Sequence, residues 1–382
     1  MQSPNTRWPI FLLGATLISL IIILFPHSTT DRGASNNVER AWNPSARRTY
    51  TTSIPEPHRV YRKALIIASV QKEDTNWTST LPDNVDVHRY INDNPQAEFT
   101  VPMNKGNEVM AYLTYLIDHY DRLPEVMVFV HAHEFTHHNP WLLAEHTPTM
   151  VRRLSPHRVI REGYMNLHCG SWDEGTCPAT IRPTEGRPWR EFQDIWESLF
   201  PNDPVPEVLA QHCCGQFAIS RHRALQVPRE EFIRLRQWMF DTKMNLGITG
   251  QFWEYLWHFI FTGKNIYCPD QHVCYCDGFG ICFEDDAEFN RVNNLLLGVD
   301  KLYAEVKLSR EQVRAMEDIE DTEPREQVAD SALARQDRMT AVMQDMSADV
   351  WSTVAKARSR GRDPRIRAER SKRRWEEGDG FN

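Results

Sequence analysis

Two continuous apolar runs limit what this chain can fold into. Residues 64–70 (ALIIASV) and 125–130 (EVMVFV) are short, rich in β-branched side chains and nearly free of polar residues. Such runs are typical of strands buried on both faces of a sheet. Between them, apolar residues recur at helical spacing: Val109, Tyr112, Leu113, Leu116, Ile117 and Tyr120. A helix of this length is a sufficient crossover, so the pattern predicts two parallel strands joined by a helix.

Strand and helix patterns continue to alternate in the rest of the body. Residues 216–220 (QFAIS) predict a short strand, and stripes of aromatic and aliphatic residues predict helices near residues 192–199, 232–239 and 253–260. The expected fold class is α/β: a single three-layer domain over residues 59–300 with a mostly parallel sheet. Ligands of such sheets bind outside the carboxyl ends of the strands, so a site is expected in segments 69–77 and 131–139.

An uncharged stretch near the N-terminus predicts a membrane anchor. Trp8 to Phe25 are 18 residues without a charge, enough for a tilted transmembrane helix. A cleaved secretory signal is the alternative, but the run exceeds the usual signal core and the following FPHSTT lacks a small-residue cleavage site. We therefore expect a cytoplasmic tail at 1–7, a signal-anchor helix at 8–26 and a flexible stem at 27–58.

Eight cysteines follow this stretch, and their even number favours disulfides in an oxidising lumen. They are Cys169, Cys177, Cys213, Cys214, Cys268, Cys274, Cys276 and Cys282. Four lie within residues 268–282, where the C-x5-C-x-C-x5-C spacing differs from the C-x2-C of common zinc sites; this favours a disulfide knot over a metal cluster. Adjacent cysteines bridge each other only with strain, so at least one of Cys213 and Cys214 is expected to pair elsewhere, with Cys169 or Cys177 as candidate partners.

The cysteines also decide the expected orientation, since Arg7 and Arg32 flank the apolar stretch evenly. Asn76-Trp77-Thr78 is a glycosylation sequon with Asn76 as the acceptor. Together these features predict a single-pass type II glycoprotein of the endoplasmic reticulum or Golgi with a lumenal body.

Charge is distributed unevenly along the chain. The formal net charge of −8 is mildly acidic, and we expect no nucleic acid as a partner. Residues 301–382 are charge-dense, with an acidic run at 317–323 followed by a basic run at 356–374. The RSKRR sequence could be a nuclear or nucleic-acid signal. A membrane anchor and paired cysteines argue against that, so we expect a solvated, helical or disordered tail.

The most conspicuous motif is HAHEFTHHN at residues 131–139, and it allows two interpretations. His133-Glu134-Phe135-Thr136-His137 matches H-E-x-x-H, the zinc-protease pattern, which must lie on a helix. Here it follows a strand and precedes Pro140, which leaves little room for a helical turn. In the other interpretation His131 and His133 alternate at a strand end, point to one side and hold a divalent ion such as Mn²⁺ or Mg²⁺. Histidines that merely hydrogen-bond loops are the alternative.

Acidic side chains supply the remaining candidates. Glu73 and Trp77 follow the first strand, and Glu108 begins the first helix; an acidic group beside an exposed tryptophan suits sugar hydroxyls or a nucleotide base. A helix-start carboxylate is the simpler explanation for Glu108. Glu254, on a tryptophan-rich helix, is a candidate general base or acceptor-hydroxyl ligand, or else a structural partner for an arginine.

The chain from Ala64 to Phe283 resembles the fungal domain of unknown function 3431 (DUF3431) family. The resemblance is carried by ALIIASVQKEDTNW, NEVMAYLTYLIDHYDRLPEVMVFVHAH, GYMNLHC, CCGQFAISRHRALQVP, WEYLWHFIF and CPDQHVCYCDGFGIC. It implies an anchored protein with a lumenal body. The family pattern covers Glu73, Trp77, Glu108, Asp121, Leu123-Pro124, His131, His133, His138-Asn139, Cys213-Cys214, Gln216-Phe217, Arg221 and Glu254. Thr136-His137 depart from that pattern, which makes the H-E-x-x-H match look accidental.

The family's layout is also similar to nucleotide-sugar glycosyltransferases of the three-layer (glycosyltransferase-A-like) type. Those enzymes have an opening strand, a strand ending in an acidic metal motif, and a late helix with a catalytic acid; His131-x-His133 stands where D-x-D usually does. The implied roles are Glu254 as base or acceptor ligand, His131 and His133 as metal ligands or as cations, and a pocket lined by Glu73, Trp77, Glu108, His138, Gln216 and Arg221. The partner would be a nucleotide sugar or glycan. A non-catalytic binding or assembly protein is the second hypothesis, and a metal-dependent hydrolase the third.

Overall fold

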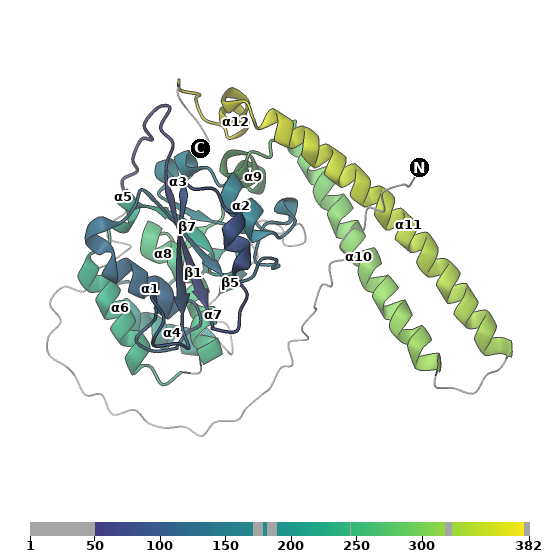
Figure 1. Ribbon diagram of the computed structural model, residues 1–382, viewed down its shortest axis with the longest axis horizontal. Helices are drawn as coiled ribbons and strands as arrows, with labels where there is room; N and C mark the ends of the chain where they lie inside the picture. The colour runs from purple at the N-terminus through teal and green to yellow at the C-terminus, as the bar shows by residue number, and fades with distance from the viewer. Residues whose placement is uncertain (1–49, 171–178, 182–188, 245, 318–322, 378–382) are drawn as a thin grey trace. The chain divides into compact units, whose positions relative to one another are not determined.

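The computed structural model describes residues 50–170, 179–181, 189–244, 246–317 and 323–377. A five-stranded sheet forms its centre (Figure 1). The strand order is β2-β1-β3-β7-β4. The strands are β1 (Lys63–Ser69), β2 (Val85–Ile91), β3 (Val126–His131), β4 (Tyr164–Asn166) and β7 (Phe217–Ser220). β1 pairs in parallel with β2 and β3, whereas β7 is antiparallel to both β3 and β4. Four strands therefore run in one direction, which confirms the expected α/β class with a mostly parallel sheet.

Helices cover both faces of this sheet, and residues of β1 alternate between the two sides. Ala64 and Ile66 belong to one hydrophobic cluster, Leu65 and Ile67 to the other. The first cluster is covered by α1 (Val109–Asp118), α4 (Trp189–Leu199), α6 (Arg229–Asp241), α7 (Leu246–Glu254) and α8 (Trp257–Thr262). The second is covered by α2 (Thr147–Arg153), α3 (Pro156–Glu162) and α9 (Gln271–Phe279).

Short elements complete this body. They are η1 (Asn76–Thr80), η2 (Tyr120–Arg122), η3 (Trp141–Leu143), α5 (Arg221–Ala224) and a small sheet of β5 (Ala179–Ile181), β6 (Leu209–Gln211) and β8 (Ile266–Tyr267). Local sequence explains where α3 begins and ends. The Ser155 side chain accepts the backbone N–H of Arg158, Pro156 occupies the first turn, and Gly163 ends the helix at a φ of 78°.

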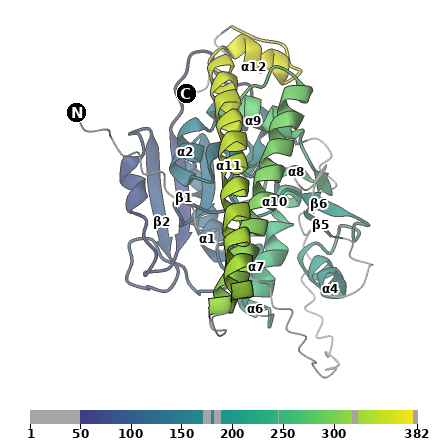
Figure 2. The same ribbon diagram turned by 90° about the vertical axis from the view of Figure 1, so that its right-hand side faces the viewer.

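Three helices follow the body: α10 (Asp286–Glu317), α11 (Glu323–Arg360) and α12 (Pro364–Arg370). α10 and α11 lie side by side (Figure 1, Figure 2), and their ends nearest the body contribute Phe289, Val292, Val350 and Val354 to the second cluster. The expected boundary at residue 300 therefore falls inside a continuous helix.

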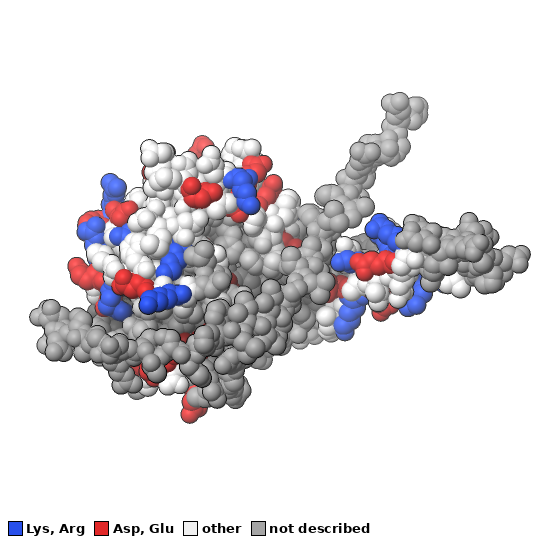
Figure 3. Space-filling model, turned by 90° about the horizontal axis from the view of Figure 1, so that it is seen from below, with Lys and Arg blue, Asp and Glu red and all other residues white. Residues whose placement is uncertain are grey.

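The basic segment after α11 is not simply a solvated tail. Arg367 is 2% exposed and donates to the backbone oxygen of Asp277, and Arg373 donates to the carboxylate of the same residue at 3.2 Å. The expectation was wrong for these residues because a buried aspartate in α9 gives them partners. Elsewhere the charges are mixed: on the face in Figure 3, described basic and acidic side chains are interspersed.

The expected N-terminal segments lie mostly outside the described residues. The cytoplasmic tail, the signal-anchor helix and the stem up to residue 49 fall there. In the part of the chain that the structure describes, no helix is both long and apolar enough to cross a membrane. The last stem residues are fastened to the body, because the Tyr50 hydroxyl donates to the Ile260 carbonyl and the Thr51 amide donates to Gln226.

One disulfide joins two residues of the second hydrophobic cluster, and it gives Cys169 another partner than the expected Cys213 or Cys214. Cys169 pairs with Cys274 and Cys276 pairs with Cys282; Cys268 is also disulfide-bonded, and Cys177 lies outside the described residues. The expected knot is largely a helix, since residues 271–279 form α9.

Cys213 and Cys214 are joined to each other, so the expectation that one of them pairs elsewhere was wrong. Cys214 and Gly215 have φ values of 92° and 61°. Two consecutive residues in this region turn the chain sharply, and the pair lies within that turn.

Candidate active site

Predicted site residues from three segments meet at one edge of the sheet. Glu73 follows β1, Glu108 directly precedes α1, and His131 ends β3. β7 is antiparallel to β3, so Gln216, just before β7, lies beside His131 and its Oε1 accepts the His131 backbone N–H at 2.9 Å. This edge contains the carboxyl ends of β1 and β3, where the sequence places the site.

The side chains of two glutamates lie against one glycine of this edge. A Cβ at Gly215 would lie 2.9 Å from Glu108 Oε1 and 3.2 Å from Glu254 Cγ. Glu254 is the last residue of α7, and its Oε2 accepts the Cys214 backbone N–H at 3.1 Å. Glu108 is 6% exposed, and its Oε1 has no hydrogen-bond partner. The turn at Cys213–Gly215 therefore brings together two carboxyl groups from helices that are distant in sequence.

Burial changes the acidity of both groups. It raises the pKa of Glu108 to about 8, and the nearby charge of Glu254 acts in the same direction. Burial also raises the pKa of Glu254 to about 7, opposed by the N–H of Cys214. Among the described residues, no lysine or arginine lies within ion-pair distance of either carboxyl group. Near neutral pH this pair can therefore hold a proton and exchange it, as acid–base catalysis requires.

A pair of imidazoles adjoins the carboxyl groups. His131 Nδ1 lies 2.7 Å from His138 Nδ1, and His131 Nε2 lies 3.9 Å from Glu108 Oε2. Burial, reinforced by His138, lowers the pKa of His131 to about 3; burial and His137 lower that of His138 to about 4. Both rings are neutral at physiological pH, so one donates and the other accepts. A cationic role, one of the roles expected for these histidines, does not suit the lowered pKa of His131.

Tyr112 belongs to the same group, although the sequence pattern assigned it to the core stripe of its helix. It lies one turn along α1 from Glu108, on the same face of the helix. Its hydroxyl is fully buried and has no hydrogen-bond partner, as is also true of Glu108 Oε1 and His131 Nε2. Buried polar atoms in native proteins nearly always have a partner. Two such atoms beside the unpartnered oxygen of the Glu108 carboxyl group suit a ligand with hydroxyl or phosphate oxygens.

His131 and His133 do not converge on a common point. His133 has a 57% exposed side chain with Nε2 3.7 Å from Glu73 Oε1, whereas His131 faces Glu108. Glu73 Oε2 in turn accepts the Val70 backbone N–H at 2.7 Å. In the described part of the chain, neither histidine belongs to a group of three side chains able to hold a metal ion. The predicted divalent ion does not fit these two residues.

Other predicted binding residues have structural partners or lie elsewhere. Trp77 is only 5% exposed and its indole N–H donates to the Ala132 carbonyl, so it is not the exposed tryptophan that the sequence suggested. Gln216 is buried, and its side-chain amide donates hydrogen bonds to the 131–139 loop, namely to the His138 carbonyl and to Asn139 Oδ1. Asn76, the predicted glycan acceptor, is exposed.

Arg221 lies at the opposite end of the sheet. Its backbone N–H donates to the Glu125 carbonyl, at the residue before β3 begins, whereas His131 is where β3 ends. The six residues of β3, which follow Glu125 and end at His131, separate the two by about 20 Å. The structure therefore does not bring Arg221 to the candidate site, because β7 runs away from the site toward α5.

The H-E-x-x-H stretch is not helical. Residues 132–140 form turns and an isolated bridge between Phe135 and His146. Glu134 Oε1 lies 3.2 Å from His146 Nε2 rather than beside a second motif histidine. The helical arrangement that a zinc protease requires is therefore absent from this stretch, which is described in full.

Comparison with known proteins places the chain by its sequence. The family described as "Protein of unknown function (DUF3431)" matches residues 65–277, more than half of the chain. No curated protein and no solved structure matches. The matched region contains Glu73, Glu108, His131, Gln216 and Glu254, the candidates that the resemblance had indicated. The chain belongs to the DUF3431 family.

Proposed function

We propose that this protein is a glycosyltransferase-like enzyme that transfers a sugar from a nucleotide sugar to a hydroxyl group of a glycan. The observation that carries the proposal is the pair of buried Glu108 and half-buried Glu254, whose pKa values are raised to about 8 and about 7, beside unpartnered polar atoms of Tyr112 and His131. The layout gives secondary support by analogy: β1 is the opening strand, β3 ends in His131-x-His133, and α7 is the late helix with an acid.

Glu254 is the base of the proposed reaction. Its carboxylate takes the proton of the acceptor hydroxyl as that oxygen bonds to the anomeric carbon, while the bond from that carbon to the nucleotide diphosphate breaks. Glu108, protonated at neutral pH, donates a hydrogen bond to the substrate; His131 Nε2 and the Tyr112 hydroxyl orient its oxygens. Since His131 and His133 face different carboxylates, no step is assigned to a divalent ion.

The test measures both ligand binding and turnover with the purified full-length chain. One class of nucleotide sugar should raise the melting temperature, because ligands that bind only the folded state stabilise it. Glu254→Gln should keep that stabilisation and lose about 10²- to 10⁴-fold in transfer rate. Wild-type turnover should rise with pH through about 7, as Glu254 loses its proton.

Glu230→Gln, an exposed carboxyl on α6, is the matched control and should change neither binding nor rate. Absence of stabilisation by every nucleotide sugar would contradict the proposal. So would normal turnover by Glu254→Gln.

We propose a type II membrane location for this enzyme, with the body in the lumen of the endoplasmic reticulum or Golgi. The disulfides at Cys169–Cys274 and Cys276–Cys282 and the exposed sequon residue Asn76 support an oxidising compartment. The body should resist protease in sealed microsomes, and Asn76→Gln should remove a glycosidase-sensitive mass increment. Protease digestion of the body in intact microsomes would overturn the location.

The α10–α11 pair favours a second candidate, a non-catalytic assembly protein. Several apolar side chains on these helices are exposed: Leu308, Val328, Leu333, Val342 and Trp351. Such side chains suit contact with a second copy of the chain. This role would be favoured over catalysis if the chain forms concentration-dependent dimers that Leu333→Ser weakens, and if none of the nucleotide sugars tested raises its melting temperature.

A further inference from the structure

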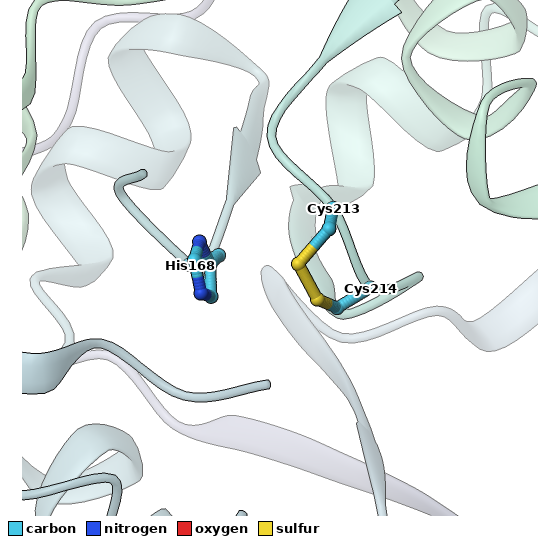
Figure 4. Close-up of side chains that lie close together, drawn as sticks. All are labelled: His168, Cys213 and Cys214. Atoms are coloured by element: carbon cyan, nitrogen blue, oxygen red, sulfur yellow. A yellow bond between two sulfur atoms is a disulfide. The ribbon is translucent and has the colours of Figure 1, made fainter. Parts of the chain in front are cut away.

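The turn that joins β6 to β7 brings three potential metal ligands together. Cys213 and Cys214 form a vicinal disulfide in this turn, and His168 lies across from it, two residues after β4 (Figure 4). One ligand atom from each of the three residues lies within 4.8 Å of the other two. With the disulfide intact, neither sulfur is a thiolate, so the cluster binds no metal in its oxidised form.

Two observations indicate that this arrangement is more than a chance proximity. His168 is 4% exposed, and its Nδ1 is buried without a hydrogen-bond partner. The two segments are also tied together by Asn166, whose Oδ1 accepts the His168 backbone N–H and whose Nδ2 donates to the His212 carbonyl. The backbone of His168 is therefore held beside the segment that carries the sulfur pair by a buried polar network.

The cysteine pair is accessible from one side. Cys213 is partly exposed, whereas Cys214 is 4% exposed. A reductant thiolate can therefore attack the sulfur of Cys213, with the sulfur of Cys214 as the leaving group.

We propose that reduction of the Cys213–Cys214 disulfide creates a Cys2His site with His168 for a soft metal ion such as Zn²⁺ or Cu⁺. A dithiol reductant supplies two electrons and two protons, the S–S bond breaks, and the reductant becomes a disulfide. The metal then displaces the two thiol protons and binds two thiolates and one imidazole. Soft thiolate ligands select these ions, and three protein ligands leave a coordination position open.

The test uses Cd²⁺ alone as the probe, because its thiolate complexes absorb in the ultraviolet. The full chain is treated with a limiting dithiol, and mass spectrometry after alkylation identifies the cysteines that were reduced. Wild-type protein with free Cys213 and Cys214 thiols should bind one Cd²⁺ per chain and show the thiolate band; untreated protein should not. His168→Gln should weaken Cd²⁺ binding roughly tenfold or more.

The control separates this site from the other disulfides. Cys276→Ser/Cys282→Ser should bind Cd²⁺ like the wild type after the same treatment, whereas Cys213→Ser/Cys214→Ser should lose the thiolate band. The proposal is overturned if protein with free Cys213 and Cys214 shows no thiolate band, or if His168→Gln binds as tightly as the wild type. Near-ultraviolet circular dichroism confirms that each variant remains folded.

Discussion

The molecule contains two buried groups of ionisable side chains that differ in how their charges are balanced. Around Asp277 in α9, the carboxylate accepts from Arg158, Arg161 and Arg373 at 3.0, 2.8 and 3.2 Å. Burial alone would favour the neutral acid, but these cations hold the pKa of Asp277 well below its usual range. Around Glu108 and Glu254 there is no such compensation in the described structure, and both pKa values rise toward neutrality.

This difference separates a structural cluster from a candidate catalytic one. A buried carboxylate surrounded by arginines stays charged across the physiological range and cannot exchange a proton, so its role is to hold elements together. A largely buried pair of carboxyl groups without neighbouring cations lowers the stability of the fold when it ionises. Its pKa values lie near neutral pH, as acid–base catalysis requires. The arginine group around Asp277 fastens α3, α9 and the basic C-terminal segment. The Glu108–Glu254 pair lies where the parallel strands end.

The largest expected effect comes from removing the balanced charge. Asp277→Asn leaves the buried Arg158 and the partly buried Arg161 and Arg373 without their carboxylate, so it should destabilise the fold by about 3–5 kcal/mol. Denaturant unfolding measures this loss. Asp241→Asn, at the exposed end of α6, is the control and should change the free energy of unfolding by less than about 0.5 kcal/mol. Equal stability of the two variants would show that the arginine cluster does not fasten the C-terminal segment.

The second effect depends on pH and has the opposite sign. The pKa of Glu108 is higher in the folded protein than in the unfolded chain, so its contribution to stability is complete below about pH 4.5 and is lost as the pH rises through about 8. Glu108→Gln cannot ionise and should escape this loss. The variant should therefore gain about 4 kcal/mol relative to the wild type between pH 5 and pH 9.

Melting temperatures of both proteins across that range provide the measurement. His131 and His138 titrate below their usual range in both proteins, so they cancel in the difference. Glu230→Gln serves as the exposed control. A difference between variant and wild type that stays constant with pH would show that Glu108 is not buried as described.

The sequence predicted the features of the fold and of the site that depend on local pattern. The runs at 64–70 and 125–130 are indeed the central strands, and the carboxyl-end rule identified the edge where Glu108 and His131 lie. Glu254 was named as a candidate, but nothing in a one-dimensional pattern pairs it with Glu108. That pairing depends on the Cys213–Gly215 turn, whose backbone conformation is set by tertiary contacts.

The misses have the same physical origin. Tyr112 has the spacing of a core residue, and only its position one turn from Glu108 distinguishes it. The basic C-terminal residues looked solvated because Asp277, their partner, is distant in sequence. Arg221 was assigned to the site by the family resemblance, and the short QFAIS run does not reveal the direction of β7 relative to β3, which places Arg221 at the opposite end of the sheet.

A smaller effect is expected at the glycine between the two carboxyl groups. Gly215→Ala places a Cβ 2.9 Å from Glu108 Oε1 at a φ of 61°, so it should cost about 1–2 kcal/mol and displace Glu108. Gly298→Ala in α10 is the control: it meets only the flexible end of Met346 and gains helix propensity. Thermal unfolding and the pH dependence of stability measure both outcomes. The geometry described for the carboxyl pair is wrong if the two variants are equally stable.

The smallest effect is expected where the sequence motif is most conspicuous. Glu134 is the glutamate of the H-E-x-x-H match, and in a zinc protease its replacement would remove the base that activates zinc-bound water. Here its side chain is 48% exposed on a non-helical segment and contacts His146 at 3.2 Å. Exposed pairs of this kind contribute at most about 1 kcal/mol, so Glu134→Gln should leave both stability and nucleotide-sugar binding nearly unchanged. Metal analysis of the purified chain completes the measurement. Loss of function in folded Glu134→Gln, with one zinc ion per wild-type chain, would replace the proposed carboxyl pair with a hydrolase centred on this stretch.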